Sequence, residues 1–220
     1  FAGRLLGALN DGAFCLMASI GHRTGLFDAM RDQAPLTSPE IASRAGLNER
    51  YVREWLGCMG AGRIVEYDPA GGTYRLPPEH AAFLTTAAGP DNMAFFAQYI
   101  SLLGSVELDI VECFRKGGGV PYSAFPRFQA LQGAETARLF DASLVDVILP
   151  LAPGVVDRLE TGAEAADVGC GQGHAINVMA RAFPKSRFTG YDISEEGVGA
   201  GRAEAAAWGL SNAHFEIRDA

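Results

Sequence analysis

The run Asp167-Val168-Gly169-Cys170-Gly171-Gln172-Gly173 constrains the fold more than any other feature of this sequence. It follows a short apolar segment at 165–168 that is typical of a strand, and it precedes helical spacing from about residue 174 to 182. Glycines at such a turn adopt backbone angles closed to other residues and let the main chain approach a ligand, while the first amides of the helix point toward it. The run therefore predicts a nucleotide-type binding site at a strand-to-helix turn.

Strand and helix signals alternate after this run. A strand is predicted at 187–191, then a helix at about 195–208 that Gly209 closes, then a strand at 214–218. Alternation at this period indicates an α/β fold with a parallel, doubly wound, Rossmann-like sheet.

The dehydrogenase fingerprint G-x-G-x-x-G fits the glycine run less well. Read from Gly169, its last position falls on His174, and Gly173 arrives one residue early. Dinucleotide binding is therefore the weaker interpretation.

The acidic-first form Asp-x-Gly-x-Gly-x-Gly resembles the first motif of class I S-adenosylmethionine-dependent methyltransferases. The resemblance implies that the loop, with Gly169, Gly171 and Gly173, wraps the methionine portion of S-adenosylmethionine (SAM). It also implies that Asp167 helps to hold the amino group of that portion.

Two further acids agree with this resemblance. Asp192 ends the second predicted strand 19 residues after Gly173, where a carboxylate accepts hydrogen bonds from both ribose hydroxyls. Asp219 ends the third predicted strand, at the position where the family's acid takes up the adenine amino group. The neighbouring residues Ile193 and Ala220 complete the set that the resemblance assigns to the cofactor.

A purely structural interpretation is also open for each residue taken alone. The three glycines would then form only a tight turn, and Asp192 would cap the next helix, with Ser194 as a competing cap. Three acids at three successive strand ends are a much more specific signal than the loop by itself, and they favour the methyltransferase interpretation.

Residues 1–85 predict a winged helix. Thr37 and Glu40 form a capping box at the start of one short helix, Asn48 caps the next, and a hairpin follows with strands at 63–67 and 73–76. This domain resembles the N-terminal winged helix of bacterial small-molecule methyltransferases, which mainly pairs two subunits. The resemblance implies a homodimer, with a partner for the apolar seam of the first helix at Leu6, Leu9, Ala13, Leu16 and Ile20.

The remaining chain divides near residue 160. Residues 86–160 are predicted as a helical connector and possible active-site lid, because they carry a flexible Gly-Pro loop at 116–122. Residues 161–220 are predicted as the first half of the cofactor-binding domain. The chain begins at Phe1 and ends directly after Asp219, so we expect it to be a piece whose further sheet strands are missing here.

The net charge of -8 disfavours nucleic-acid partners. A winged-helix DNA-binding regulator that senses SAM remains the alternative, although residues 1–85 hold eight arginines and no lysine against nine acidic residues. Four scattered cysteines and four histidines give no metal-ligand spacing, and no apolar run is long enough to span a bilayer. The absence of an export signal favours the cytoplasm.

The sequence thus predicts a methyltransferase that acts on a small-molecule acceptor, and the resemblance to the family favours oxygen as the acceptor atom. No catalytic residue can be assigned. His174 is expected at the surface without a carboxylate partner, and Cys170 is expected to fit the turn without acting as a nucleophile.

Overall fold

A computed structural model describes residues 1–219 of the chain. The chain forms two compact units, Phe1–Pro126 and Arg127–Ala220, and each is described by itself. Ala220, expected beside the adenine ring, lies outside the described residues.

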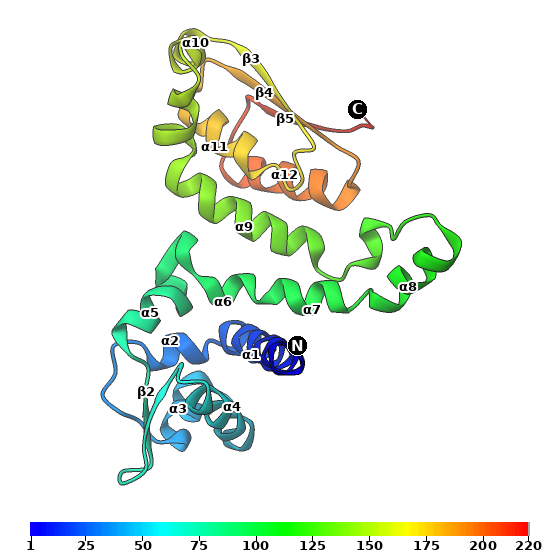
Figure 1. The fold of residues 1–220 in the computed structure, drawn as a ribbon. Helices are drawn as coiled ribbons and strands as arrows, with labels where there is room; N and C mark the ends of the chain where they lie inside the picture. The colour runs from blue at the N-terminus through cyan, green and yellow to red at the C-terminus, as the bar shows by residue number, and fades with distance from the viewer. Residues whose placement is uncertain (220) are drawn as a thin grey trace. The chain divides into compact units, whose positions relative to one another are not determined.

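The first unit is mostly helical (Figure 1). Short 3-10 turns lie at Thr86–Asp91 and Tyr122–Ala124. Its helices and strands are α1 (Ala2–Thr24), α2 (Leu26–Met30), α3 (Ser38–Ala45), α4 (Glu49–Ala61), β1 (Glu66–Asp68), β2 (Thr73–Arg75), α5 (Pro78–Leu84), α6 (Met93–Phe96), α7 (Gln98–Gly104) and α8 (Glu107–Lys116).

The helix-turn-helix begins at the caps that the sequence predicts. The Thr37 amide and hydroxyl both donate to Glu40 at 2.7 Å, which completes the capping box of α3. Asn48 accepts from the Arg50 amide at 3.1 Å and so starts α4. The wing is the antiparallel hairpin β1–β2, in which Tyr67 lies opposite Tyr74.

The wing strands differ from the prediction. The first strand was expected at 63–67, but it begins only at Glu66. Arg63 takes a left-handed φ of 60°, and the amides of Ile64 and Val65 both donate to the Met59 carbonyl. These residues close the end of α4, so they are not available to pair in the hairpin.

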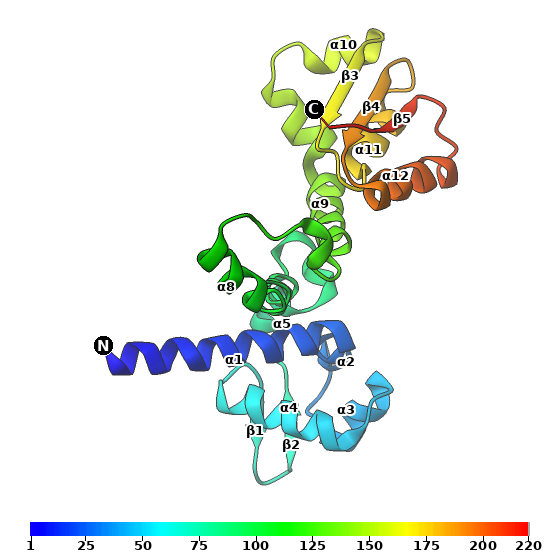
Figure 2. The ribbon, with the colours of Figure 1, turned by 90° about the vertical axis from the view of Figure 1, so that its right-hand side faces the viewer.

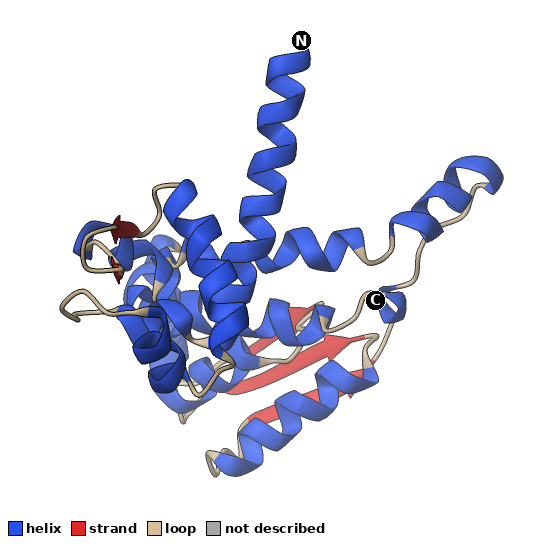
Figure 3. Ribbon diagram, turned by 90° about the horizontal axis from the view of Figure 1, so that it is seen from below, coloured by secondary structure: helices blue, strands red, loops and turns tan. Residues whose placement is uncertain are grey.

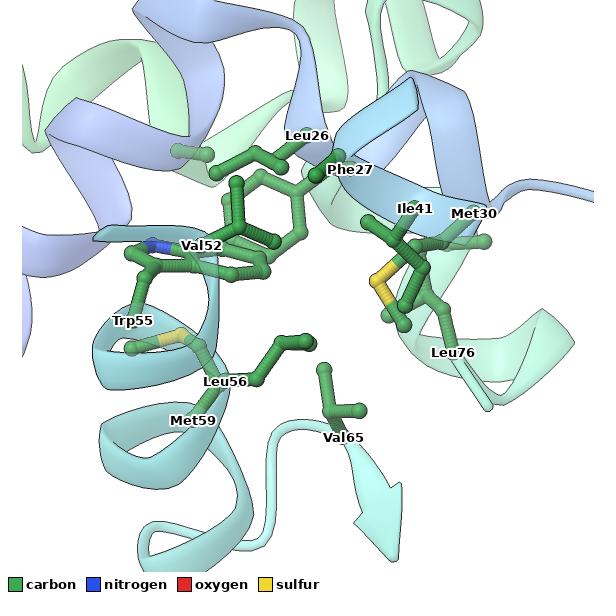
Figure 4. Close-up of a cluster of buried hydrophobic side chains, with 13 residues drawn as sticks. Leu26, Phe27, Met30, Ile41, Val52, Trp55, Leu56, Met59, Val65 and Leu76 are labelled. Atoms are coloured by element: carbon green, nitrogen blue, oxygen red, sulfur yellow. The ribbon is translucent and has the colours of Figure 1, made fainter. Parts of the chain in front are cut away.

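The core of the first unit centres on Trp55 (Figure 4). Its ring lies 5.1 Å from that of Phe27, and its Nε1 donates to the Met17 carbonyl of α1 at 2.8 Å. Gly21 of α1 must stay small here, because an added Cβ would lie 2.5 Å from the Trp55 ring. The inward face of α1 is therefore fixed to α4.

The predicted apolar seam of α1 lies on its other side. Leu6 and Leu9 are 60% and 64% exposed, and Leu16 and Ile20 are exposed as well. Beside α1, an apolar groove of about 610 Å³ lies between Phe14 and Cys15 on one wall and Met93 and Ile100 on the other.

The second unit is built around a parallel sheet (Figures 1 and 2). A π turn at Leu144–Ile148 and a 3-10 turn at Leu149–Leu151 follow its first helix. Its elements are α9 (Phe128–Ser143), α10 (Val155–Thr161), β3 (Glu164–Val168), α11 (His174–Ala182), β4 (Arg187–Asp192), α12 (Glu195–Ala207) and β5 (Ala213–Ile217).

The three described strands lie in the order β3-β4-β5, all parallel, with Ala165 opposite Phe188 and Gly190 opposite Phe215. Right-handed crossovers place α11 and α12 on the same face of the sheet, as labelled in Figure 1. Phe188 and Phe215 pack there against Ile176 of α11. Figure 3 distinguishes the strands from the helices by colour. This alternation confirms the predicted Rossmann-like half, and it places the three strand ends side by side.

Candidate functional site

The glycine loop between β3 and α11 has the predicted strained backbone. Gly169, Gly171 and Gly173 take φ values of 80°, 54° and 69°, which residues with a Cβ rarely adopt. The amides of Gly169 and Cys170 both donate to the Tyr191 carbonyl of β4, at 2.8 and 3.0 Å. An added Cβ at Gly169 or Gly171 would meet no atom within 4 Å, so one side of the loop is open to a ligand.

Asp192 at the end of β4 is hydrogen-bonded to the backbone of the loop. Its Oδ2 accepts from the Gly171 amide at 2.7 Å, and its Oδ1 accepts from the Ser194 amide at 2.8 Å. Ser194, not Asp192, caps α12, because its hydroxyl accepts from the Gly197 amide. Each carboxylate oxygen has a further lone pair for a ligand hydroxyl.

Asp167 at the end of β3 is the second carboxylate of the site. Burial raises the pKa of Asp167, and the nearby charge of Asp192 raises it further. Two partly buried carboxylates on neighbouring strand ends repel each other, so a cationic ligand placed between them would relieve that cost.

Two glycines of α12 allow this helix to pack closely against the loop. A Cβ on Gly197 would lie 2.5 Å from the Gly171 carbonyl oxygen, and one on Gly201 would lie 3.0 Å from the Gln172 carbonyl oxygen. The sequence analysis missed these two residues. Their spacing of four, which places both on one face of a helix, is the signal that could have found them.

Cys170 is half-buried within the loop. Burial raises the pKa of the Cys170 thiol to about 11, and the charges of Asp167 and Asp192 add to the effect. The thiolate needed for nucleophilic attack is therefore disfavoured, in keeping with the structural role expected of this residue.

Two further predicted site residues, Ile193 and Asp219, lie at the same edge of the sheet. Ile193 follows Asp192 and is exposed. Asp219 follows β5 and is exposed, and the preceding amide of Arg218 donates to the Asp192 carbonyl at 2.9 Å. The structure thus brings Asp192 into direct contact with the loop and places Asp167 close enough for its pKa to respond to the charge of Asp192, with Asp219 on the neighbouring strand end.

His174 was expected at the surface without a carboxylate partner, and both expectations are wrong. Its side chain is only 10% exposed, with Glu204 at 2.8 Å from one ring nitrogen and Asp141 at 3.1 Å from the other. Sequence spacing could not reveal this cluster, because its three residues come from three helices.

Among residues 1–219, no group of three or more His, Cys, Asp or Glu side chains could hold a metal ion.

The second helix of the helix-turn-helix, α4, is the one that would read DNA. Its Arg50 pairs with Glu54 at 3.1 Å and its Arg53 approaches Glu49 at 3.8 Å, so acids offset the positive charge that phosphates would need. No single helix in the described part of the chain is long and apolar enough to cross a membrane, although two bent helix pairs reach the length and composition together.

A parallel sheet whose first strand ends in an open glycine loop, with acids at the successive strand ends, defines a Rossmann-like nucleotide-binding fold. Comparison with protein families agrees with this assignment. Residues 12–86 match the Rv2258c-like winged HTH domain, and residues 159–220 match the Methyltransferase domain family. The chain therefore has the architecture of a class I SAM-dependent methyltransferase with an N-terminal winged helix.

Solved structures show the same fold at low sequence identity. Human N-acetylserotonin methyltransferase in complex with SAM matches with a TM-score of 0.64 and 17% identity over 99% of this chain and 66% of its own. An O-methyltransferase family protein from Burkholderia thailandensis matches with a TM-score of 0.68 and 16% identity, over 100% of this chain and 64% of its own. The mitomycin 7-O-methyltransferase MmcR matches with a TM-score of 0.68 and 16% identity, over 99% of this chain and 66% of its own.

The chain thus spans slightly less than two thirds of the length of these structures. No curated protein matches the sequence significantly.

Proposed function

We propose that this protein is a SAM-dependent methyltransferase that transfers a methyl group to a small-molecule acceptor, at oxygen. The observation that carries the proposal is the open glycine loop with two carboxylates beside it: Asp192, which accepts from the Gly171 amide, and Asp167, which precedes the loop in β3. A loop in which every second residue is glycine lets a ligand approach its backbone, and the two acids suit a ligand with an ammonium group and vicinal hydroxyls.

SAM fits this chemistry residue by residue. Asp167 would hold the ammonium of the methionine portion, and the loop at Gly169, Gly171 and Gly173 would lie along that portion. Asp192 would accept from the ribose hydroxyls with the lone pairs that Gly171 and Ser194 leave. Ile193, Asp219 and Ala220 would contact the adenosine end.

When bound, SAM supplies a methyl group already activated by the positive sulfur, so the protein's task is to align the acceptor and exclude water. In this chain, the loop and the two carboxylates would fix the position of the donor. A catalytic base is not required where positioning suffices, and none is assigned to this chain.

The proposed class of acceptor is supported by the net charge of the chain and by the similar solved structures. A net charge of -8 disfavours polyanionic acceptors, and two of the similar structures are described as O-methyltransferases. These features together support a small molecule with a hydroxyl acceptor.

We further propose that the protein is a homodimer joined by its first unit. The seam at Leu6 and Leu9 on α1 exposes large apolar side chains along one helix, and Leu108 and Phe114 of α8 are exposed as well. Such surface is costly to leave in water. In this scheme residues 1–85 pair the subunits, 86–160 form the connector and lid, and 161–220 hold the cofactor.

The test is a calorimetric titration of the wild type and Asp192→Asn with S-adenosylhomocysteine, the product form of the cofactor. The amide keeps the shape of the carboxylate but replaces one of its two acceptor oxygens with a donor, so affinity should fall by about tenfold or more, given about 1.5–3 kcal/mol for a hydrogen bond to a charged group. Circular dichroism checks that the variant folds. The exposed Asp157→Asn on α10 is the matched control. Equal affinity of Asp192→Asn and wild type would remove Asp192 from the site.

A further inference from the structure

A cluster of three titratable side chains in the second unit, His174, Asp141 and Glu204, takes no part in the proposed cofactor contacts. His174 is the first residue of α11, directly after the glycine loop. Its Nδ1 lies 2.8 Å from Glu204 Oε1 on α12, and its Nε2 lies 3.1 Å from Asp141 Oδ1 on α9. One imidazole therefore links three helices.

The geometry favours the charged form of this ring. An ionised carboxylate only accepts hydrogen bonds, and a neutral imidazole has only one N–H to donate. With a carboxylate oxygen at each ring nitrogen, both contacts are satisfied as hydrogen bonds when the ring carries two protons. Loss of one proton leaves a ring lone pair facing an anionic oxygen.

Glu204 fixes the whole first turn of α11, not only His174. Its second oxygen, Oε2, accepts from Asn177 Nδ2 at 2.8 Å, and the same amide group donates to the Gly201 carbonyl at 3.0 Å. Asn177 is fully buried. Helix α11, which follows the loop, is thus hydrogen-bonded to α12 through two residues one turn apart, His174 and Asn177.

The glycine loop lies against the elements that His174 joins. A Cβ on Gly133 of α9 would lie 2.0 Å from Gln172 Oε1, and one on Gly201 of α12 would lie 3.0 Å from the Gln172 carbonyl oxygen. The loop is therefore supported by α9 on one side and α12 on another. The position of these two helices sets the position of the loop backbone.

Aromatic and charged side chains of the neighbouring elements also lie near the His174 ring. Trp208 lies edge-on to the imidazole with ring centroids 5.6 Å apart, and Arg181 of α11 stacks 4.1 Å above Trp208. On α9, Arg138 lies one turn before Asp141. Asp146 of the π turn that packs on α11 is exposed. Asp141 and Glu204 are the charges in direct contact with His174.

We propose that His174 is a positioning residue, which as an imidazolium bridges Asp141 and Glu204 and so holds the glycine loop in its ligand-binding form. This inference rests on the proposed function, because it assigns to His174 the control of cofactor affinity. Loss of one ring proton would remove one of the two hydrogen bonds that join α11 to α9 and α12. The affinity for the cofactor should therefore fall as the pH rises.

The experiment measures S-adenosylhomocysteine affinity at several pH values from 5.5 to 8.5, for the wild type, His174→Gln and the control His214→Gln. His214 is half-buried on β5, where it lies opposite Thr189 of β4. We expect the wild-type and His214→Gln affinities to fall at least threefold from pH 6 to pH 8. His174→Gln should bind weakly at pH 6 and show no such dependence.

A second readout needs no ligand. Hydrogen-exchange protection of the amides at 171–177, corrected for the intrinsic pH effect, should fall with rising pH in the wild type and stay constant in His174→Gln. Asp141→Asn, which loses one charged contact at an exposed position, should reduce the pH effect without unfolding the protein.

The two proposals fail in different ways. A flat wild-type profile, or an unchanged profile in His174→Gln, overturns the role of His174 while leaving cofactor binding in place. No binding at any pH, with the exchange effect intact, overturns the proposed function while the positioning role stands.

Discussion

The Asp192 carboxylate and the Gly171 amide, 2.7 Å apart, join the end of the second parallel strand to the middle of the glycine loop. This hydrogen bond makes Asp192 part of the loop's support as well as a candidate ligand contact. The loop therefore has its open conformation fixed before a ligand arrives, which reduces the ordering cost of binding.

Neutralising Asp167 should have opposite effects on stability and on binding. Asp167→Asn removes the repulsion from Asp192 and the cost of burying a charge, so the protein without ligand should unfold at a higher temperature at pH 7. The same change should weaken S-adenosylhomocysteine binding by about tenfold or more, because it removes the proposed contact of Asp167 with the ligand's ammonium group. Thermal unfolding and calorimetry measure the two effects.

The pH dependence of that stabilisation has a definite sign. The pKa of Asp167 is raised in the folded protein, so its favourable contribution exists below the unfolded pKa and is lost as the pH rises through the folded value. The increase in stability that Asp167→Asn gives at pH 7 should therefore disappear in acid, where Asp167 of the wild type is protonated. The exposed Glu164→Gln at the other end of β3 should show neither effect, and a destabilised Asp167→Asn at pH 7 would refute the argument.

Two glycines in the same helix should respond differently to alanine. Gly199→Ala on α12 meets no atom within 4 Å and should stabilise the protein by about 0.5–1 kcal/mol. Gly197→Ala places a Cβ 2.5 Å from the Gly171 carbonyl oxygen, so it should destabilise the protein and weaken ligand binding together. Urea denaturation with calorimetry distinguishes them, and equal behaviour of the pair would show that α12 does not support the loop.

Cys170 should be slow to react with alkylating agents. With a pKa of about 11, its thiol stays protonated at pH 8. Iodoacetamide labelling followed by peptide mass spectrometry should leave Cys170 unmodified in the folded protein and modify it after denaturation. Rapid labelling of the folded protein at pH 8 would contradict the raised pKa.

A charge in the α1 seam should prevent the dimerisation that we propose. Leu9→Glu places a carboxylate on a side chain that is 64% exposed in the chain alone, so the variant should fold and run as a monomer in light scattering. Tyr51→Glu, at an exposed aromatic position on α4, is the control and should remain dimeric. A Leu9→Glu protein of unchanged mass would remove the seam from the interface.

The local features of this fold could be predicted from sequence because they depend on near neighbours. The capping box of Thr37 and Glu40, the cap at Asn48 and the strand-helix alternation after Asp167 are all confirmed. Each is set by residues a few positions apart, within the range that periodicity and capping rules describe.

The support of the site could not be predicted in the same way. The bond of Asp192 to Gly171 joins residues 21 apart, and the bridge from His174 to Asp141 spans 33. Such contacts depend on how helices pack on the sheet, which alternation alone does not specify. The start of the first wing strand was predicted wrongly for a related reason. The amides of residues 63–65 donate hydrogen bonds to carbonyls at the end of α4, so these residues do not pair in the hairpin.

The most direct test of the central claim is a calorimetric titration of the protein with S-adenosylhomocysteine, run beside NADH and a random DNA duplex. The loop and its two carboxylates predict binding of S-adenosylhomocysteine alone. Failure to bind it, together with salt-sensitive binding of the duplex, would contradict the methyltransferase assignment and place the function in the winged helix.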